Sequence, residues 1–217
     1  MSRHSAMHHL GIYHGTDKHN SEHTFAGESY LDVYHNILKD RRDVPNQTIV
    51  EIGVFNGASI RTMRDYFHPT CNFIGVDINP NSKNVESARF NVIIGSQVSP
   101  DTIQELKEST PDGIDLLVDD GSHLVDHMLQ TFDMVFPHIK SGGWYIIEDT
   151  GNTYRDLTND VKGWHGMEYN DPETTNYNHE RQDIDKFILD HVHNIDSKIG
   201  SVRELRVYNQ MIAIKKV

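Results

Sequence analysis

The sequence predicts an α/β protein with a Rossmann-like, doubly wound, mostly parallel sheet, and two observations lead to that fold class. Short apolar runs alternate with stretches of helical spacing between residues 48 and 147. Two further runs of alternating apolar and polar residues, joined at Asn209-Gln210, predict an antiparallel hairpin. Alternating strands and helices favour a parallel sheet with helices on both faces, to which the hairpin adds an antiparallel edge.

The expected strands are short runs of β-branched and other apolar residues, and together they make a sheet of seven. They occupy residues 48–52, 73–76, 91–94, 114–118, 144–147, 203–208 and 211–216. The first five are nearly continuous apolar runs, which is typical of parallel strands covered on both faces. The last two alternate, which is typical of strands with one face exposed.

The expected helices have apolar residues at intervals of three and four positions. They occupy residues 25–38, 58–67, 100–109, 124–139 and 180–195. Asp101 and Thr102 suit the first turn of the third helix, and Gly142-Gly143 follows the fourth and closes it.

The chain has the size of a single domain. Its 217 residues, 36% of them hydrophobic, suit one domain with one sizeable core. Residues 1–24 are polar and rich in histidine, so we expect an irregular arm in which His4, His8 and His9 bind no metal. Residues 151–178 are polar and unusually long for a connection, so we expect a lid over the active site.

Composition disfavours several classes of protein. A formal net charge of -12 is unsuited to binding nucleic-acid phosphates. Cys71 is the single cysteine, which rules out an internal disulfide and fits a reducing compartment. The sequence has no apolar run near the ~20 residues of a membrane span and no signal-peptide pattern at its start. We therefore expect a cytoplasmic protein without a membrane or nucleic-acid partner.

The first predicted strand ends in a glycine turn that indicates a cofactor site. The pattern is Glu51-x-Gly53-x-x-x-Gly57, and Asp77 closes the next strand. Glycines there allow a tight turn and a close approach of the backbone to a ligand, while an acid at the position of Asp77 can bind ribose hydroxyls. The pattern lacks the dense glycines of a pyrophosphate site, so S-adenosylmethionine fits better than a dinucleotide. The alternative is a turn with no ligand.

Two further residues are candidates for the same cofactor site. Gln97 follows the third predicted strand and either faces the adenine or is an ordinary loop amide. Asp119 closes the fourth strand and either caps the next helix or contacts the methionine part of the cofactor.

Two acid pairs, Asp119-Asp120 and Glu148-Asp149, follow the fourth and fifth predicted strands, and His123 lies close behind the first pair. Ligands of open α/β sheets bind outside the carboxyl ends of the strands, so these side chains should meet there. Four carboxylates repel one another unless a cation joins them, which predicts a divalent metal. The alternatives are a helix-capping role for Asp120, ordinary loop acids at 148 and 149, and a hydrogen-bonding loop residue at 123.

In combination these segments resemble class I S-adenosylmethionine-dependent methyltransferases, and more narrowly the metal-dependent sugar O-methyltransferases of macrolide biosynthesis, of the mycinamicin and macrocin type. The narrower resemblance spans roughly residues 11 to 154. Its segments are Gly15-Thr16-Asp17-Lys18 with Tyr30 and Tyr34, Asp119-Asp120-Gly121-Ser122-His123, Phe136-Pro137-His138, Gly142-Gly143 and Ile147-Glu148-Asp149-Thr150.

The resemblance implies roles for the acidic residues and the histidine. Asp120, Glu148 and Asp149 fall on the positions that bind Mg²⁺, and His123 falls on the position of the general base. It also implies an acceptor hydroxyl on a sugar or glycosylated small molecule, and relatives that assemble as more than one copy. Some relatives carry an additional oligomerising domain before this region, where this chain has only the short arm.

The expected lid contributes candidates for contact with the acceptor, and other functions remain open. Tyr154, Trp164 and Tyr169 are aromatic residues suited to packing on a sugar ring. A catechol acceptor is an alternative, because catechols also chelate Mg²⁺. A metal-dependent hydrolase and a non-catalytic cofactor-binding module are alternatives from other classes.

Overall fold

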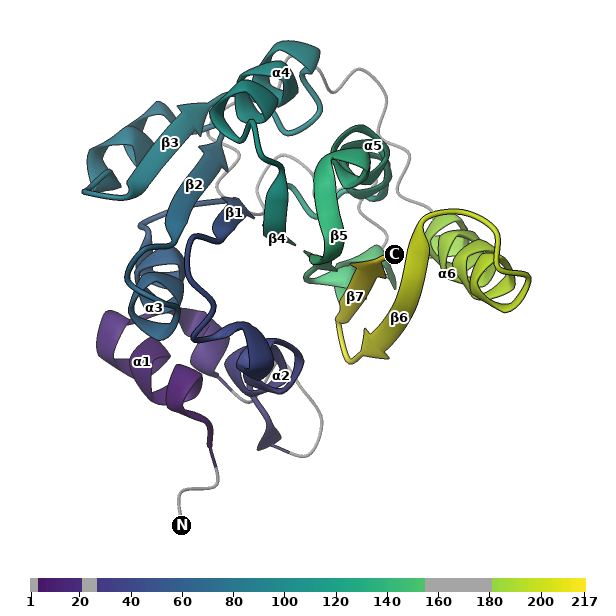
Figure 1. Cartoon of the computed structure of the whole chain (residues 1–217), viewed down its shortest axis with the longest axis horizontal. Helices are drawn as coiled ribbons and strands as arrows, with labels where there is room; N and C mark the ends of the chain where they lie inside the picture. Colours follow the sequence, from purple (N-terminus) through teal and green to yellow (C-terminus); the bar gives the residue numbers. More distant parts are fainter. Residues whose placement is uncertain (1–3, 21–26, 155–180) are drawn as a thin grey trace.

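The computed structural model describes residues 4–20, 27–154 and 181–217, and a seven-stranded sheet lies at its centre (Figure 1). The strand order is β3-β2-β1-β4-β5-β7-β6. The strands are β1 (Thr48–Ile52), β2 (Asn72–Asp77), β3 (Phe90–Ile94), β4 (Ile114–Asp119), β5 (Ile139–Ile147), β6 (Val202–Tyr208) and β7 (Met211–Lys216). This sheet confirms the fold class that the sequence predicts.

The direction of the strands also agrees with the prediction. Strands β1 to β5 pair in parallel, and β7 runs antiparallel between β5 and β6. Strands β6 and β7 form the predicted hairpin, in which Tyr208 pairs with Met211 across the turn. The sheet order reverses between β1 and β4, so the carboxyl ends of these two strands flank the crevice in which open α/β sheets bind ligands.

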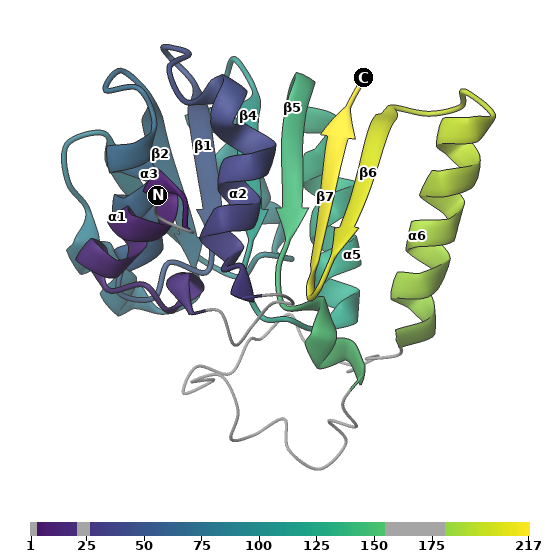
Figure 2. The same ribbon diagram turned by 90° about the horizontal axis from the view of Figure 1, so that it is seen from below.

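Helices cover both faces of the sheet, as Figure 2 shows. Helices α1, α2 and α3 share one apolar cluster with one face, and α4, α5 and α6 share a second cluster with the other. The helices are α1 (Ala6–His14), α2 (Tyr30–Leu38), α3 (Ala58–Tyr66), α4 (Pro100–Ser109), α5 (Val125–Val135) and α6 (Arg181–Asp196).

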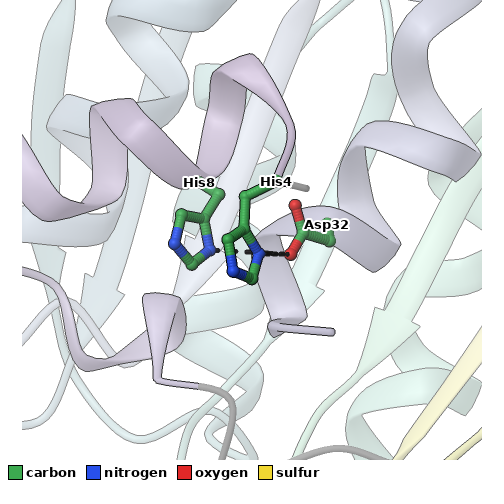
Figure 3. A group of neighbouring side chains, drawn as sticks. All are labelled: His4, His8 and Asp32. Carbon is green, nitrogen blue, oxygen red and sulfur yellow. Dashed lines mark hydrogen bonds and ion pairs between the residues drawn. The ribbon is translucent and has the colours of Figure 1, made fainter. Parts of the chain in front are cut away.

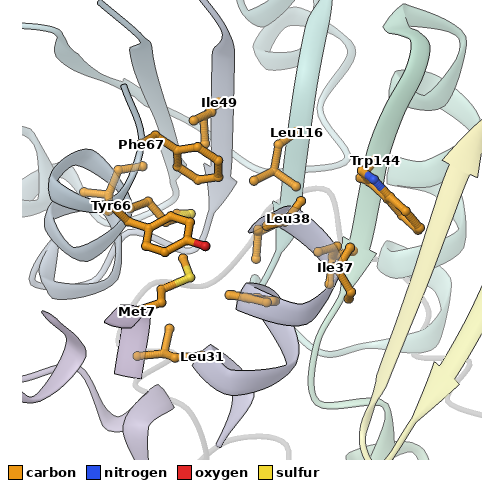
Figure 4. Packing of buried hydrophobic residues seen from close by; sticks show 14 of the residues in the cluster. Met7, Leu31, Ile37, Leu38, Ile49, Tyr66, Phe67, Leu116 and Trp144 are labelled. Atoms are coloured by element: carbon orange, nitrogen blue, oxygen red, sulfur yellow. The ribbon is translucent and has the colours of Figure 1, made fainter. Parts of the chain in front are cut away.

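The two clusters explain why the central strands are almost continuously apolar. Successive side chains of a strand point to opposite faces, so Leu116 joins the first cluster and Leu117 the second. Trp144 and Tyr145 divide in the same way. Figure 4 shows the first cluster, in which Met7 of α1 is among the side chains that pack between the helices and the sheet. Burial on both faces removes the need for a polar alternate position.

The N-terminal arm differs from the expectation of an irregular segment. Within residues 4–20 the structure has helix α1, whose first turn is capped by the Ser5 side chain accepting from His8 N–H. Met7 is fully buried, and burial of one apolar side chain of this size contributes about 1.5–3 kcal/mol. The sequence prediction was wrong here because the helix is short and its packing against the domain, rather than its own propensity, stabilises it.

Two histidines of the arm hold α1 against α2 (Figure 3). His4 Nδ1 lies 2.8 Å from Asp32 Oδ2, Ser5 N–H donates to Asp32 Oδ1 at 2.7 Å, and His8 Nδ1 lies 2.7 Å from Ser29 Oγ. The rings of His4 and His8 stack with centroids 3.9 Å apart and planes 8° apart. One ligand atom from each of His4, His8 and Asp32 lies within 4.8 Å of the other two, a spacing that can also hold a metal ion, so the absence of a metal there stays a prediction. The hydrogen bonds make this cluster a clamp between the two helices.

The fourth predicted helix ends earlier than expected, and the following strand begins earlier. Helix α5 ends at Val135, a 3₁₀ turn covers Phe136–His138, and β5 starts at Ile139. Pro137 explains the difference, because it has no N–H to donate to a preceding carbonyl and its ring clashes with the helix backbone. Gly142 and Gly143, expected as a helix end, lie within strand β5 instead.

Two further expectations concern membranes and the lid. Among the described ranges, no helix is both long and apolar enough to cross a membrane. The start of the expected lid is a 3₁₀ turn, Thr150–Tyr154. The rest of residues 151–178 lies outside the described residues, so the lid stays a prediction.

Candidate active site

The loops that follow β1, β4 and β5 come together because these strands are neighbours in the sheet. The parallel hydrogen bonding continues one residue past each strand: Asp120 N–H donates to Ile52 O at 3.0 Å, and Glu148 N–H donates to Asp119 O at 2.9 Å. Asp120 and Glu148 are thereby fixed side by side at the carboxyl edge. The glycine turn and both acid pairs belong to one site.

Asp120, Asp149 and His123 form the open part of this site. His123 Nε2 lies 3.9 Å from Asp120 Oδ1 and 3.6 Å from Asp149 Oδ2. One ligand atom from each residue lies within 4.8 Å of the other two, a spacing that can hold a metal ion. About a quarter of each Asp side chain is exposed, at 23% for Asp120 and 26% for Asp149, so solvent and ligands can reach this part.

Two of these residues have a backbone conformation that side chains other than glycine rarely adopt. His123 has φ 58° and Asp149 has φ 55°, in the left-handed region. Each such residue costs of order 1–3 kcal/mol and persists when the surrounding structure imposes it. In these conformations the side chains of His123 and Asp149 each place a ligand atom within 4.8 Å of one on Asp120.

Lys18 lies at the buried end of the same acidic cluster. Its ammonium donates hydrogen bonds to Asp120 Oδ2 and, at 2.5 Å, to Glu148 Oε2, and it lies 4.0 Å from Glu51 Oε1. Burial alone would lower the pKa of Lys18, but Asp120, Glu148 and Glu51 together raise it well above the usual value. Lys18 is therefore a cation held within this acidic cluster.

One ammonium does not satisfy the carboxylates around it. Glu148 Oε1 and both carboxylate oxygens of Glu51 are buried without a hydrogen-bond partner among the described residues. Burial raises the pKa of Glu51 and that of Glu148 to about 7 each, with Lys18 opposing the rise. The site thus contains more buried acid than positive charge. Carboxylate oxygens are the ligands that Mg²⁺ prefers, so these residues fit a divalent cation.

Tyr30 is the second residue that contacts the acids from outside the strand loops. Its hydroxyl donates to Asp149 Oδ1 at 2.7 Å. Burial, followed by the charge of Asp149, raises the pKa of Tyr30 well above its usual value, so the phenol stays protonated. Tyr34, one helical turn later, is fully buried in the first apolar cluster.

The glycine turn brings the cofactor candidates beside the acids. A Cβ on Gly53 would lie 1.9 Å from Asp120 O, so only glycine allows β1 and the Asp120 loop to approach so closely. Gly57 has φ 74° and precedes helix α3 as its N-cap residue. Asp77 accepts hydrogen bonds from Val54 N–H and Phe55 N–H, which fixes the turn from the end of β2.

Asp119 and Gln97 are hydrogen-bonded to each other and to neighbouring groups of the protein. Gln97 Nε2 donates to Asp119 Oδ1 and to Thr131 Oγ1, both at 3.0 Å, and Gln97 Oε1 accepts from Ser122 N–H. Asp119 also accepts from Tyr145 Oη–H, and burial raises its pKa to about 7. The structure shows these two residues bracing the loop after β4, and their contacts with a cofactor stay predictions.

The helix-capping alternative for the first acid pair is wrong. Helix α5 begins at Val125, its N-cap residue is Leu124, and no side chain caps it. Asp119 and Asp120 are turned toward Tyr145 and Lys18 instead.

Two residues of the site, Lys18 and Tyr30, were not predicted to contact the acids. From the sequence, Lys18 was expected either to cap the cofactor site or to lie in a surface turn, and Tyr30 was expected to pack within its helix. The signal that could have found them was the segment Gly15-Thr16-Asp17-Lys18 with its downstream tyrosines, which formed part of the resemblance. Trp164 and Tyr169 lie outside the described residues, and Tyr154 lies in the turn after β5 without a described side chain. Their contact with an acceptor is untested.

Comparison with known proteins agrees with this architecture. Residues 50–150 match the family model described as a methyltransferase domain. The chain is 32% identical over 152 residues to 8-demethyl-8-alpha-L-rhamnosyl tetracenomycin-C 2'-O-methyltransferase of Streptomyces olivaceus, covering 67% of this chain and 38% of that protein. It is 33% identical over 122 residues to mycinamicin VI 2''-O-methyltransferase of Micromonospora griseorubida, covering 52% of this chain and 30% of that protein. The chain therefore spans well under half the length of these curated relatives.

Solved structures of methyltransferases are also similar to this chain. The MycE methyltransferase of the mycinamycin biosynthetic pathway, in complex with Mg, SAH and mycinamycin VI, superposes with a TM-score of 0.73 at 25% identity. The match covers 99% of this chain and 55% of that one. An O-methyltransferase from Bacillus cereus in complex with SAH shares the fold at a TM-score of 0.55 and 11% identity.

The fold and the matched segment indicate one class of protein: residues 50–150 are similar to a methyltransferase domain. Several of its curated relatives are O-methyltransferases named for tetracenomycin, macrocin and mycinamicin, as the sequence resemblance indicated.

Proposed function

We propose that the protein is an S-adenosylmethionine-dependent and Mg²⁺-dependent O-methyltransferase that acts on a hydroxyl of a sugar or glycosylated small molecule. The observation that carries this proposal is the meeting of the glycine turn after β1 with Asp120, His123 and Asp149. A cofactor turn and a base beside a cluster of carboxylates are what methyl transfer to a metal-bound hydroxyl requires.

The cofactor is proposed to lie along the turn from Gly53 to Gly57. Glu51, Asp77, Gln97 and Asp119 complete the proposed cofactor set, with Asp77 at the ribose. Mg²⁺ is proposed to bind Asp120, Glu148 and Asp149, where it would lower the pKa of an acceptor hydroxyl and fix its position. The free Oε1 of Glu148 and the oxygen-only donor set support this assignment.

His123 is the proposed general base. As the acceptor oxygen attacks the methyl carbon, the bond from carbon to sulfur breaks and sulfur keeps the electron pair, leaving S-adenosylhomocysteine. His123 Nε2 takes the hydroxyl proton, and the nearby carboxylates of Asp120 and Asp149 stabilise the imidazolium that forms. Holding the oxygen in line with the methyl group supplies the rest of the acceleration.

The acceptor class rests on the relatives. Tyr154, Trp164 and Tyr169 remain the proposed contacts for its ring, and a catechol remains the alternative acceptor. Cytoplasmic location and assembly as more than one copy also remain proposals.

The other classes receive less support. A purely cofactor-binding module has no use for a histidine that strained backbone holds between two carboxylates. A hydrolase would leave the glycine turn beside the acids without a role.

Calorimetric titration with S-adenosylmethionine, with and without Mg²⁺, tests the proposal. We expect micromolar binding of the cofactor in both conditions, with methyl transfer to glycosylated acceptors only when Mg²⁺ is present. NADH serves as the control ligand. Failure of S-adenosylmethionine to bind in either condition would overturn the proposed function.

A further inference from the structure

Lys18 has a place that the proposed mechanism does not explain. Its side chain is 5% exposed, and its ammonium is bonded to Asp120 and Glu148, two of the three proposed Mg²⁺ ligands. The ammonium therefore uses the carboxylate oxygens that a divalent cation would use. Two carboxylates from different strand loops thus bind one ammonium, as they would bind a metal cation.

A short turn delivers Lys18 to this position. Gly15 has φ 73° and ends helix α1, with its N–H and that of Thr16 donating back to Gly11 O. The 3₁₀ turn Asp17–His19 follows, and the Thr16 side chain caps it by accepting from Lys18 N–H. A Cβ at Gly15 would meet nothing within 4 Å, so there is open space beside the point where the turn leaves the helix.

The helix on which the turn is built stays anchored independently of Lys18. Met7 is buried under α1, and Asp32 of α2 binds both His4 and the Ser5 N–H. Withdrawal of the Lys18 side chain would therefore leave α1 in place. Only the Lys18 side chain, or the turn that carries it, has to move for the ammonium to leave the carboxylates.

Charge balance favours replacement of the Lys18 ammonium by a divalent cation. Lys18 supplies one positive charge to Asp120, Glu148 and Glu51, and three carboxylate oxygens of the two glutamates stay buried without a hydrogen-bond partner among the described residues. A divalent cation supplies two charges and can accept several oxygen ligands at once. Two cations confined to the same oxygens repel each other strongly, so they should exclude one another.

We propose that Lys18 is an internal counter-ion of the acidic cluster, which holds Asp120 and Glu148 together in the metal-free protein and is displaced when a divalent cation binds them. The inference rests on the proposed metal site. Metal binding and the conformation of the turn at residues 15–20 are then thermodynamically coupled. A cation that binds the carboxylates also releases the turn.

Amine acylation of the wild-type protein tests the displacement directly. The protein is treated with an acetylating N-hydroxysuccinimide ester, without and with Mg²⁺, and the labelling rate of each lysine is followed by peptide mass spectrometry. We expect Lys18 to be protected without Mg²⁺ and to be labelled several-fold faster with it. Lys186 on α6, whose side chain is 72% exposed, serves as the internal control and should not change.

Calorimetric titration with Mg²⁺ gives an independent measurement. Lys18→Met removes the charge and keeps the length of the side chain, and Lys186→Met is the control that removes one charge elsewhere. We expect Lys18→Met to bind Mg²⁺ at least about tenfold more tightly than the wild type, because a competing cation is lost. Lys186→Met should bind like the wild type.

The outcomes separate this inference from the proposed function. If Mg²⁺ binds the wild type, and Asp120→Asn abolishes the binding, while Lys18 stays protected and Lys18→Met gains no affinity, the counter-ion role is wrong and the metal site stands. If neither the wild type nor Lys18→Met binds Mg²⁺, both the inference and the metal site fall.

Discussion

The hydroxyl of Tyr30 donates a hydrogen bond to Asp149 Oδ1 at 2.7 Å, and the other oxygen of the same carboxylate lies 3.6 Å from His123 Nε2. Tyr30 is the first residue of α2, whereas Asp149 follows β5. This bond ties a helix from the start of the chain to the carboxyl edge of the sheet. It fixes the orientation of one proposed metal ligand toward the proposed base.

Replacement of Tyr30 by phenylalanine should therefore weaken metal binding. The change removes the donor but keeps the ring that packs in the core, and loss of such a supporting hydrogen bond typically costs 10- to 100-fold in metal affinity. Calorimetric titration with Mg²⁺ measures the effect. The control is Tyr13→Phe, because Tyr13 is 80% exposed on α1. Equal Mg²⁺ affinities for Tyr30→Phe and the wild type would show that Asp149 needs no such support.

Replacement of Asp120 by asparagine should abolish turnover and leave cofactor binding nearly intact. Asp120 is the carboxylate shared by the Lys18 contact and the open cluster with His123, so its charge is central to the proposed metal site. Mg²⁺ and S-adenosylmethionine titrations, together with a methyl-transfer assay, separate the two effects. Asp40→Asn, on the exposed turn after α2, is the control for loss of one negative charge. Retained turnover in Asp120→Asn would contradict the ligand assignment.

Replacement of His123 by alanine should lower the methyl-transfer rate by ~10²- to 10⁴-fold, which is the usual contribution of a general base. Binding of S-adenosylmethionine should not change, because His123 lies beside the carboxylates of Asp120 and Asp149 rather than in the glycine turn proposed to bind the cofactor. The control is His193→Ala on the exposed face of α6. Full activity of His123→Ala would rule out the base assignment, whatever the metal dependence.

Two glycine substitutions separate a steric clash from backbone strain. Gly53 and Gly142 both have positive φ, at 85° and 73°, but a Cβ at Gly53 would lie 1.9 Å from Asp120 O, whereas one at Gly142 would meet nothing within 4 Å. Gly142→Ala should cost only the ~1–2 kcal/mol of a left-handed residue. Gly53→Ala should cost clearly more and displace the Asp120 loop. Urea unfolding measures both, and equal losses of stability would mean that the loop yields without cost.

The pH dependence of stability should reveal the clamp between α1 and α2. Burial alone would raise the pKa of Asp32, but hydrogen bonds from His4, Ser5 and Ser29 outweigh it and lower the pKa well below the usual value. A lowered folded-state pKa stabilises the protein above the unfolded pKa of ~3.9, and this contribution is lost as the pH falls from there toward the folded-state pKa.

The matching variant is Asp32→Asn, which keeps the size of the side chain and removes its charge. It should be less stable than the wild type by about 1–3 kcal/mol at pH 7. The difference should narrow as the pH is lowered from 5 toward 3, as followed by urea unfolding. A difference that is constant over this range would show that the charge of Asp32 does not contribute.

Many strands and helices were predictable because their positions follow from the properties of their own residues. Helix α4 was expected at residues 100–109 and found there, since Pro100 and Asp101 suit a first turn wherever the helix packs. Helix α1 was missed because its stability comes from the burial of Met7 against the rest of the domain. Strand β5 was expected too short because pairing with β4, rather than local propensity, extends it back to Ile139.

The candidate site was predictable where it lies on strand ends. Asp120, Glu148 and Asp149 each follow an apolar run, and adjacent parallel strands bring such ends together by rule. Lys18 and Tyr30 reach the same place from α1 and α2, across more than a hundred residues of sequence. No local pattern states which loop will cover a given end of a sheet.

The sequence by itself determined the alternation of strands and helices, the glycine turn and the positions of the acids, because these follow from periodicity and from the conformational freedom of individual residues. The tertiary structure decided which charges meet. It buried Lys18 between Asp120 and Glu148, turned Asp119 toward Gln97 and Tyr145, and set Asp149 between Tyr30 and His123. The physical reason is that buried charge is stable only with partners, and the packed fold alone fixes which partners lie within reach.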